Sequence, residues 1–118
     1  MATYSRLLLS GSTSGKPIPV VATTTIGTTI HTAVSGASSF DELYLWASNV
    51  TGAAATLTVE WGGATDPGNH MTKAYSISAN SPPVPIATGQ VLNGGLLCTA
   101  FGGTASAINI TGYVNRIS

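Results

Sequence analysis

The chain has 118 residues, no net charge, and only four cationic and four anionic side chains. Four scattered cations exclude the clustered basic surface that nucleic acid requires, and the sequence contains no apolar run of about 18 residues that would span a membrane as a helix. The sparse charge and the apolar fraction of 43% instead favour one small domain that associates with copies of itself, since nothing repels them electrostatically.

Residues 1–19 are predicted to form a flexible, extended N-terminal arm and linker. Within it, residues 4–9 have the composition of a short strand, and the Gly-Ser-rich stretch 11–15 is a flexible joint. The arm carries too few apolar residues for the core of a signal peptide, so we expect the chain to fold in a cytosol. An arm of this kind is suited to adding a strand to the sheet of a neighbouring subunit.

Residues 20–118 are predicted to form one β-sandwich domain, because apolar and polar residues alternate in short stretches and no helical stripe is present. Three prolines within residues 81–86 bar a regular central strand and predict an edge or a loop there. The number and spacing of the strands indicate an antiparallel, jelly-roll-like sandwich. The predicted strands are residues 20–25, 28–33, 40–49, 54–61, 70–79, 96–101 and 107–117.

The strongest strand pattern is that of residues 40–49. Leu43 and Leu45 lie on one face, and Tyr44 and Trp46 lie on the other. Apolar groups on both faces are typical of a central strand that is covered by the core on one side and by a partner on the other. The pattern therefore makes Trp46 a candidate interface aromatic.

Two further strands indicate which side chains face the core. In residues 54–61, Trp61 continues the face of Leu57 and Val59, which favours a core tryptophan over a sugar-binding platform. The single cysteine, Cys98, excludes an internal disulfide and is predicted to be a small buried apolar residue. In residues 70–79 the side chains predicted to face inward are Tyr75, Ile77 and Ala79.

The few ionisable side chains do not combine into a catalytic pattern. Asp41 and Glu42 are adjacent, so on a strand they point to opposite faces and cannot share one substrate; we expect them at a solvated strand entry. His31 is predicted to be a half-exposed strand residue. Asp66 and His70 lie close in sequence, but a triad or a metal site would need a third group from elsewhere, and a turn explains their loop more simply.

Three segments resemble small virion proteins of tailed bacteriophages. They are LYLWASNVTGAAATLTVEWGG, PIATGQVLNGGLLCTAF and the terminal INITGYVNRIS, and together they span residues 40–118. Among such virion proteins, the chain resembles head decoration (cement) proteins or fibre components. The resemblance implies a structural role on the capsid surface, with assembly in the host bacterial cytoplasm. It also implies a homotrimer that contacts the major capsid protein or other virion proteins, and no motif of catalytic residues comes with it. We expect no metal and no cofactor.

Contacts between subunits are expected to involve exposed aromatic and arginine side chains. Two alternatives stay open: a fibre or tail trimerisation domain, and a carbohydrate-binding β-sandwich that uses Trp46 or Trp61 together with the 62–70 loop. The predicted interface residues are Tyr4, Arg6, Tyr44, Trp46, Tyr113 and Arg116.

Overall fold

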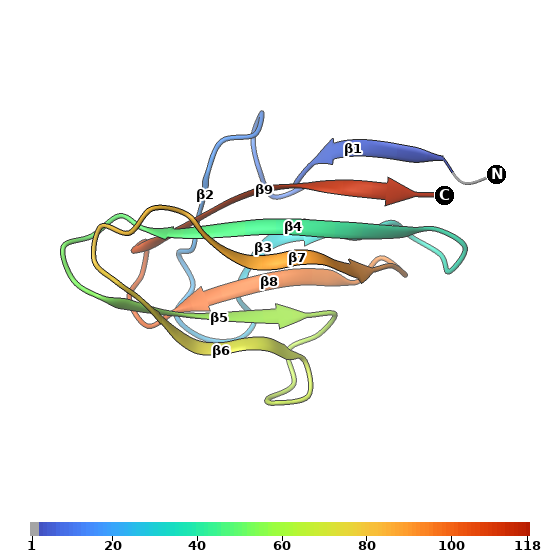
Figure 1. The fold of residues 1–118 in the computed structure, drawn as a ribbon. Coiled ribbons are helices and arrows are strands. Elements are labelled where there is room, and N and C mark those ends of the chain that lie inside the picture. The colour runs from blue at the N-terminus through green and yellow to red at the C-terminus, as the bar shows by residue number, and fades with distance from the viewer. Residues whose placement is uncertain (1–2) are drawn as a thin grey trace.

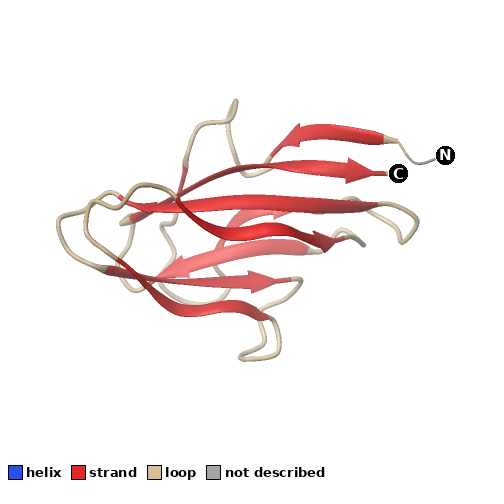
Figure 2. Cartoon of the chain, in the orientation of Figure 1, coloured by secondary structure: helices blue, strands red, loops and turns tan. Residues whose placement is uncertain are grey.

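The computed structural model describes residues 3–118 and consists of two antiparallel β-sheets packed as two layers (Figure 1). Nine strands and no helix form in this part of the chain (Figure 2). The prediction of an all-β, sandwich-like fold is therefore confirmed. The described residues accordingly contain no helix that is long and apolar enough to cross a membrane.

Five strands form the first sheet, here called sheet A, in the order β1-β9-β4-β7, with the short β2 also paired to β9. The other four form sheet B in the order β3-β8-β5-β6. The pairings nest, because β2 pairs with β9, β3 with β8, β4 with β7 and β5 with β6. The strands of sheet A are β1 (Tyr4–Leu8), β2 (Ile18–Pro19), β4 (Phe40–Asn49), β7 (Val84–Leu92) and β9 (Ile108–Ile117). Those of sheet B are β3 (Thr28–Thr32), β5 (Ala55–Trp61), β6 (His70–Ile77) and β8 (Leu97–Gly102).

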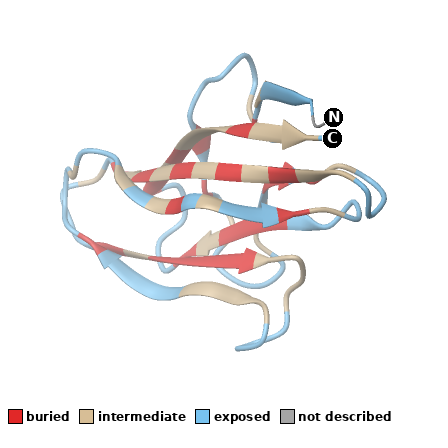
Figure 3. Ribbon diagram, turned by 45° about the vertical axis from the view of Figure 1, so that its right-hand side comes forward, coloured by how far each residue is buried: buried red, intermediate tan, exposed pale blue. Residues whose placement is uncertain are grey.

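The core lies between the inner faces of the two sheets. Along β4, buried and half-buried residues alternate over the whole strand, which places its aliphatic residues inward and its aromatic residues outward (Figure 3). Burial of each large aliphatic side chain contributes about 1.5–3 kcal/mol, so this layer provides most of the stability of the sandwich. Fully buried members of the core are Leu43, Leu45, Leu57, Val59, Ile108, Ile110 and Val114.

Most predicted strands are present close to the expected positions, and β4 has the predicted bounds. The strand predicted at residues 20–25 is wrong. This segment crosses from one sheet to the other: the Val20 amide donates to Ile108 of β9, whereas the carbonyl of Ala22 accepts from Gly102 of β8. Backbone bonds to both sheets hold the segment without making it a strand of either. The proline-rich region ends in an edge strand, β7, as expected.

The exposure of β6 differs from the prediction. Ile77 is buried, but Tyr75 is 49% exposed and Ala79 is exposed as well. Tyr75 pairs with the buried Leu57, so it lies on the same face as Ile77, as predicted. Its ring stays half exposed because β6 is the edge strand of sheet B, and Ala79 lies beyond the end of β6.

The N-terminal residues form part of the chain's own sheet. Residues 4–8 are β1, which pairs with β9, and the amides of Thr3 and Ser118 each donate to the carbonyl of the other at 2.8 and 2.9 Å. Thr3 and the C-terminal Ser118 therefore lie side by side. A free arm is not confirmed, and residues 1–2 of the predicted arm lie outside the described residues.

Candidate functional site

A row of aromatic side chains crosses the outer face of sheet A. Tyr44 of β4 and Tyr113 of β9 are direct cross-strand partners, and their rings stack with centroids 5.0 Å apart and planes 15° from parallel. Trp46 lies 6.1 Å from the Tyr113 ring at a tilt of 30°. Such pairs contribute about 0.5–1.5 kcal/mol beyond their burial, so the row is rigid before any partner binds.

The row continues onto the edge strand. The Arg6 guanidinium of β1 lies 4.6 Å from the centroid of the Tyr113 ring, a cation–π contact. Because β9 lies between β1 and β4, Tyr113 is flanked by Arg6 on one side and by Tyr44 on the other. A Cβ at Gly89 of β7 would lie 3.2 Å from the Tyr44 hydroxyl oxygen, so this glycine gives the Tyr44 ring its space.

Tyr4 adds an exposed aromatic at the end of this face. It is 72% exposed, and its neighbour on the same side of β1, Leu8, is 58% exposed. Four of the five residues of β1 are exposed, in contrast to the buried alternation of β4 (Figure 3). Five of the six predicted interface residues thus share one face of sheet A: Tyr4, Arg6, Tyr44, Trp46 and Tyr113.

Arg116, the sixth predicted interface residue, lies on the opposite face of β9. Its Nε and Nη2 donate to the two carboxylate oxygens of Asp41 at 2.7 and 3.0 Å, and Asp41 has no exposed surface. A bidentate pair of this kind is strong and geometrically fixed. The guanidinium is therefore used within the chain and holds β9 to β4.

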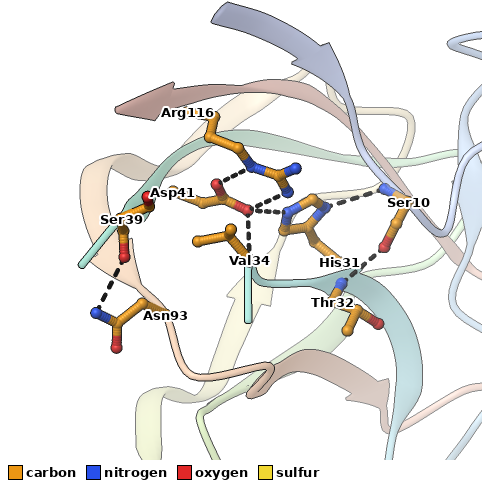
Figure 4. A network of polar contacts seen from close by, with 8 residues as sticks. All are labelled: Ser10, His31, Thr32, Val34, Ser39, Asp41, Asn93 and Arg116. Carbon is orange, nitrogen blue, oxygen red and sulfur yellow. Dashed lines mark hydrogen bonds and ion pairs between the residues drawn. The ribbon is translucent and has the colours of Figure 1, made fainter. Parts of the chain in front are cut away.

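His31 completes a buried polar network with this pair (Figure 4). Its Nε2 lies 2.8 Å from Asp41 Oδ2, and its Nδ1 accepts a hydrogen bond from the Ser10 amide at 3.0 Å. Nδ1 must be unprotonated to accept, so the ring is neutral and donates its Nε2 proton to Asp41. The predictions of a solvated Asp41 and a half-exposed His31 are wrong, since both are buried to 2% exposure or less.

The carboxyl of Asp41 remains ionised despite its position. Burial acts to raise its pKa, but the hydrogen bonds from Arg116 and His31 and the charge of Arg116 outweigh burial and hold the pKa below its ordinary value. The sequence contained a signal for this burial, because Asp41 continues the alternation of Leu43 and Leu45. Its pairing with Arg116 depends on the register of β4 and β9, which local sequence does not reveal.

A second buried carboxylate, Glu60, lies on β5. It accepts hydrogen bonds at Oε1 from the Gly27 amide at 2.8 Å and from the Thr99 hydroxyl at 2.7 Å, and at Oε2 from the Thr25 hydroxyl. Burial raises its pKa, but these bonds outweigh burial and the pKa lies below its ordinary value. Alternation along β5 places Glu60 on the polar face with Thr56 and Thr58, so it does not predict burial of this carboxylate. The segment that contains Thr25 and Gly27 covers Glu60.

The loop around residues 62–70 contains Asp66 and His70, and Nδ1 of His70 lies 3.4 Å from Oδ1 of Asp66. Neither ring nitrogen of His70 has a hydrogen-bond partner, and Lys73 binds Asp66 at 2.8 Å on the surface. Among residues 3–118, no group of three ionisable side chains is arranged to hold a metal ion. Trp61 is half-buried against the core and donates from Nε1 to the Val91 carbonyl at 3.1 Å.

Two apolar hollows lie near the connection between β7 and β8. One, of about 220 Å³, is lined by Ile26, Leu97 and the glycines of the 62–63 stretch; the other, of about 400 Å³, is lined by Phe40 and Val91, and Leu96 borders both. The neighbouring Cys98 is fully buried as predicted, and burial raises the pKa of its thiol to about 12. The hollows thus offer apolar contacts without a reactive group.

No protein-family model matches the chain, and neither a curated protein nor a solved structure matches it. The argument for function therefore depends on the chain's own surfaces.

Proposed function

We propose that the chain is a structural virion protein of a tailed bacteriophage that decorates and stabilises the capsid, as a non-enzymatic cement protein that forms homotrimers and contacts the major capsid protein. The observation that carries the proposal is the row of Tyr44, Trp46 and Tyr113, whose rings contact one another on the outer face of sheet A. Large aromatics held in place by their neighbours are typical of the centre of a protein interface.

The proposal also assigns the sandwich to the jelly-roll class. Its support is the nested pairing of four strand pairs across two four-strand layers, with β1 as an additional edge strand. Jelly rolls recur in viral capsid proteins and in lectins. The fold alone does not distinguish a capsid protein from a lectin, so the distinction depends on the side chains at its surface.

The N-terminal segment 1–19 is the second contact element of the proposal. We expect it to reach a neighbouring subunit, since β1 is an edge strand and four of its five residues are exposed. Many weak, neutral contacts of this kind add up when they repeat over a capsid lattice. Deletion of residues 1–15 should therefore weaken capsid binding, and unchanged assembly would remove the segment from the proposal.

The decisive experiment combines light scattering on the purified chain with co-sedimentation on undecorated phage heads. The expected result is a trimer that saturates the heads at a fixed stoichiometry. The Trp46→Ser variant should lose at least tenfold in apparent affinity for the heads. Tyr75→Ser is its matched control, because Tyr75 is an exposed aromatic on sheet B and outside the row. Equal binding by both variants, or a monomer that ignores heads, would contradict the proposal.

The carbohydrate-binding alternative uses Trp46 or Trp61 together with the 62–70 loop. Trp61 is half-buried against the core, and Trp46 lies on β4 of sheet A, whereas the loop follows β5 of sheet B. This arrangement favours a protein contact. Titration of the chain with glycans while tryptophan fluorescence is recorded separates the two functions. A fibre or tail trimerisation domain would use the same surface. It would form a trimer that does not bind phage heads, which distinguishes it from a cement protein.

A further inference from the structure

Apart from the two-residue β2, which contains Pro19, the two sheets have four edge strands, and three of them are irregular. In sheet A, β7 contains Pro85 and shifts register twice against β4. In sheet B, β6 shifts register twice against β5, and β3 shifts once against β8. Bulges and prolines of this kind are the devices by which native sheets prevent their edges from pairing with other chains. The three edges are therefore protected.

The fourth edge, β1, has none of these protections. Its five residues pair with β9 in continuous register, from Tyr4 opposite Ile117 to Leu8 opposite Tyr113. The strand contains no proline, no bulge and one charge, Arg6. A regular, exposed edge with apolar side chains is a template for a further strand.

The outward-facing backbone groups of β1 follow from the ladder. Thr3 and Ser118 exchange both of their backbone hydrogen bonds, so they form a hydrogen-bonded pair. Such pairs alternate along an antiparallel ladder, which directs the amides and carbonyls of Ser5 and Leu7 towards β9. The corresponding groups of Tyr4, Arg6 and Leu8 point away from the sheet, along its free edge.

We propose that the free edge of β1 pairs antiparallel with β1 of a second copy, so that two sheets A join across a two-fold axis. This inference rests on the proposed function and names one of its partners: another copy of this chain, held by backbone pairing at β1 rather than by a detached arm. On a capsid such a contact links neighbouring trimers, because a two-fold contact pairs identical surfaces and closes after two subunits.

The register follows from the side chains. Full overlap places Arg6 directly opposite Arg6 of the second copy, and like charges at that position are destabilising. A shift of two residues places Tyr4 of each copy opposite Arg6 of the other. The two Ser5 residues then lie opposite each other at the two-fold axis. Each guanidinium then meets a tyrosine ring on the same face. This register also keeps the paired residues away from the 9–17 loop, which leaves the sheet beyond Leu8 (Figure 1).

The test is sedimentation velocity of three forms of the full chain. Five-residue strands give a small interface, so we expect wild type to add a two-fold association with a dissociation constant on the order of 0.1 mM, beyond any trimer. Arg6→Pro removes the guanidinium and one outward backbone amide, and an edge strand tolerates the loss of an outward amide. The Arg6→Pro variant should abolish the two-fold association. Arg6→Ala is its control, because it also lacks the guanidinium but keeps the amide, and it should weaken the association less than tenfold.

Amide hydrogen exchange shows that β1 stays in place in the proline variant, because the Ser5 and Leu7 amides bond to β9. If Arg6→Pro loses their protection, Tyr4→Pro tests the next outward amide. Association of the proline variant at wild-type strength, or no two-fold association of wild type up to about 1 mM, would overturn the inference. Binding to phage heads is measured separately. If the chain saturates the heads but shows no two-fold association, this inference alone is refuted. If the two-fold association is present but the chain does not bind heads, the proposed function alone is refuted.

Discussion

Asp41 is the residue whose loss should cost the most stability among the polar side chains. It has no exposed surface and links β4 to Arg116 of β9, His31 of β3 and the Val34 amide at 3.1 Å. Asp41→Ala leaves the guanidinium without its partner and removes the acceptor for His31. Because the Arg116 side chain is 34% exposed, water solvates the freed guanidinium, and we expect a loss of about 2–3 kcal/mol, less than for a fully buried pair. Urea unfolding followed by tryptophan fluorescence measures the loss.

The matched control for this substitution is Asp66→Ala. Asp66 is also a carboxylate paired with a cation, but its side chain and that of Lys73 are more than half exposed, at 55% and 58%. Solvent screens such pairs, so the control should unfold close to wild type. Equal effects of the two substitutions would show that the Asp41 network is not a stabilising element.

At the scale of elements, the fold depends on the close approach of β9 and β4. A Cβ at Gly112 of β9 would lie 2.0 Å from the Tyr44 carbonyl oxygen and 3.1 Å from the Leu45 Cα. Gly112→Ala therefore has to separate the two central strands of sheet A, and we expect a loss of about 3 kcal/mol or more in the free energy of unfolding. Hydrogen exchange of the β4 and β9 amides should report the separation.

Gly52→Ala serves as the control for the Gly112 substitution. Gly52 lies in the turn after β4, and a Cβ there meets nothing within 4 Å. The two variants add the same methyl group, so a difference between them isolates the steric contact with β4. A Gly112→Ala chain as stable as the Gly52→Ala chain would contradict the argument.

The elements also show which parts of the fold local sequence can predict. The aliphatic and aromatic faces of β4 follow from alternation, and so does the outward position of Trp46. The same rule gives the face of Tyr75 but not its exposure, because alternation does not reveal that β6 is the edge strand of sheet B. The sequence pattern failed for residues 20–25, whose β-branched composition is that of a strand but whose backbone bonds to both sheets.

The candidate site divides in the same way. Alternation predicts that Tyr44 lies on an outer face, and it would also have placed Asp41 in the core. It does not predict that Tyr113 and Arg6 lie beside Tyr44, because those contacts depend on the order β1-β9-β4. Nor does it reveal that Arg116 is committed to Asp41. Contacts between strands distant in sequence are set by topology, and a single sequence carries little information on topology.

At the scale of the whole molecule, the two buried carboxylates make stability depend on acid. The pKa values of Asp41 and Glu60 are lower in the folded chain than their ordinary values. Folding therefore releases protons below about pH 4.5, where the unfolded carboxyls begin to protonate. The stabilisation is fully present above that pH and is lost as the pH falls through the folded pKa values.

The expected result is a free energy of unfolding that stays level from pH 7 to about pH 5 and then falls, by up to about 2.7 kcal/mol per pH unit when both carboxyls contribute one proton each. Denaturant unfolding at half-unit pH steps measures this slope. Glu60→Gln removes one of these protons, so its slope should be shallower than that of wild type by up to about 1.4 kcal/mol per pH unit, even if its stability is lower at every pH. Because the comparison uses slopes, it separates proton linkage from the loss of the hydrogen bonds to Thr25 and Thr99. A wild-type curve that is level down to pH 3 would contradict the ionised state of both groups. A Glu60→Gln slope equal to that of wild type would show that Glu60 does not couple folding to acid.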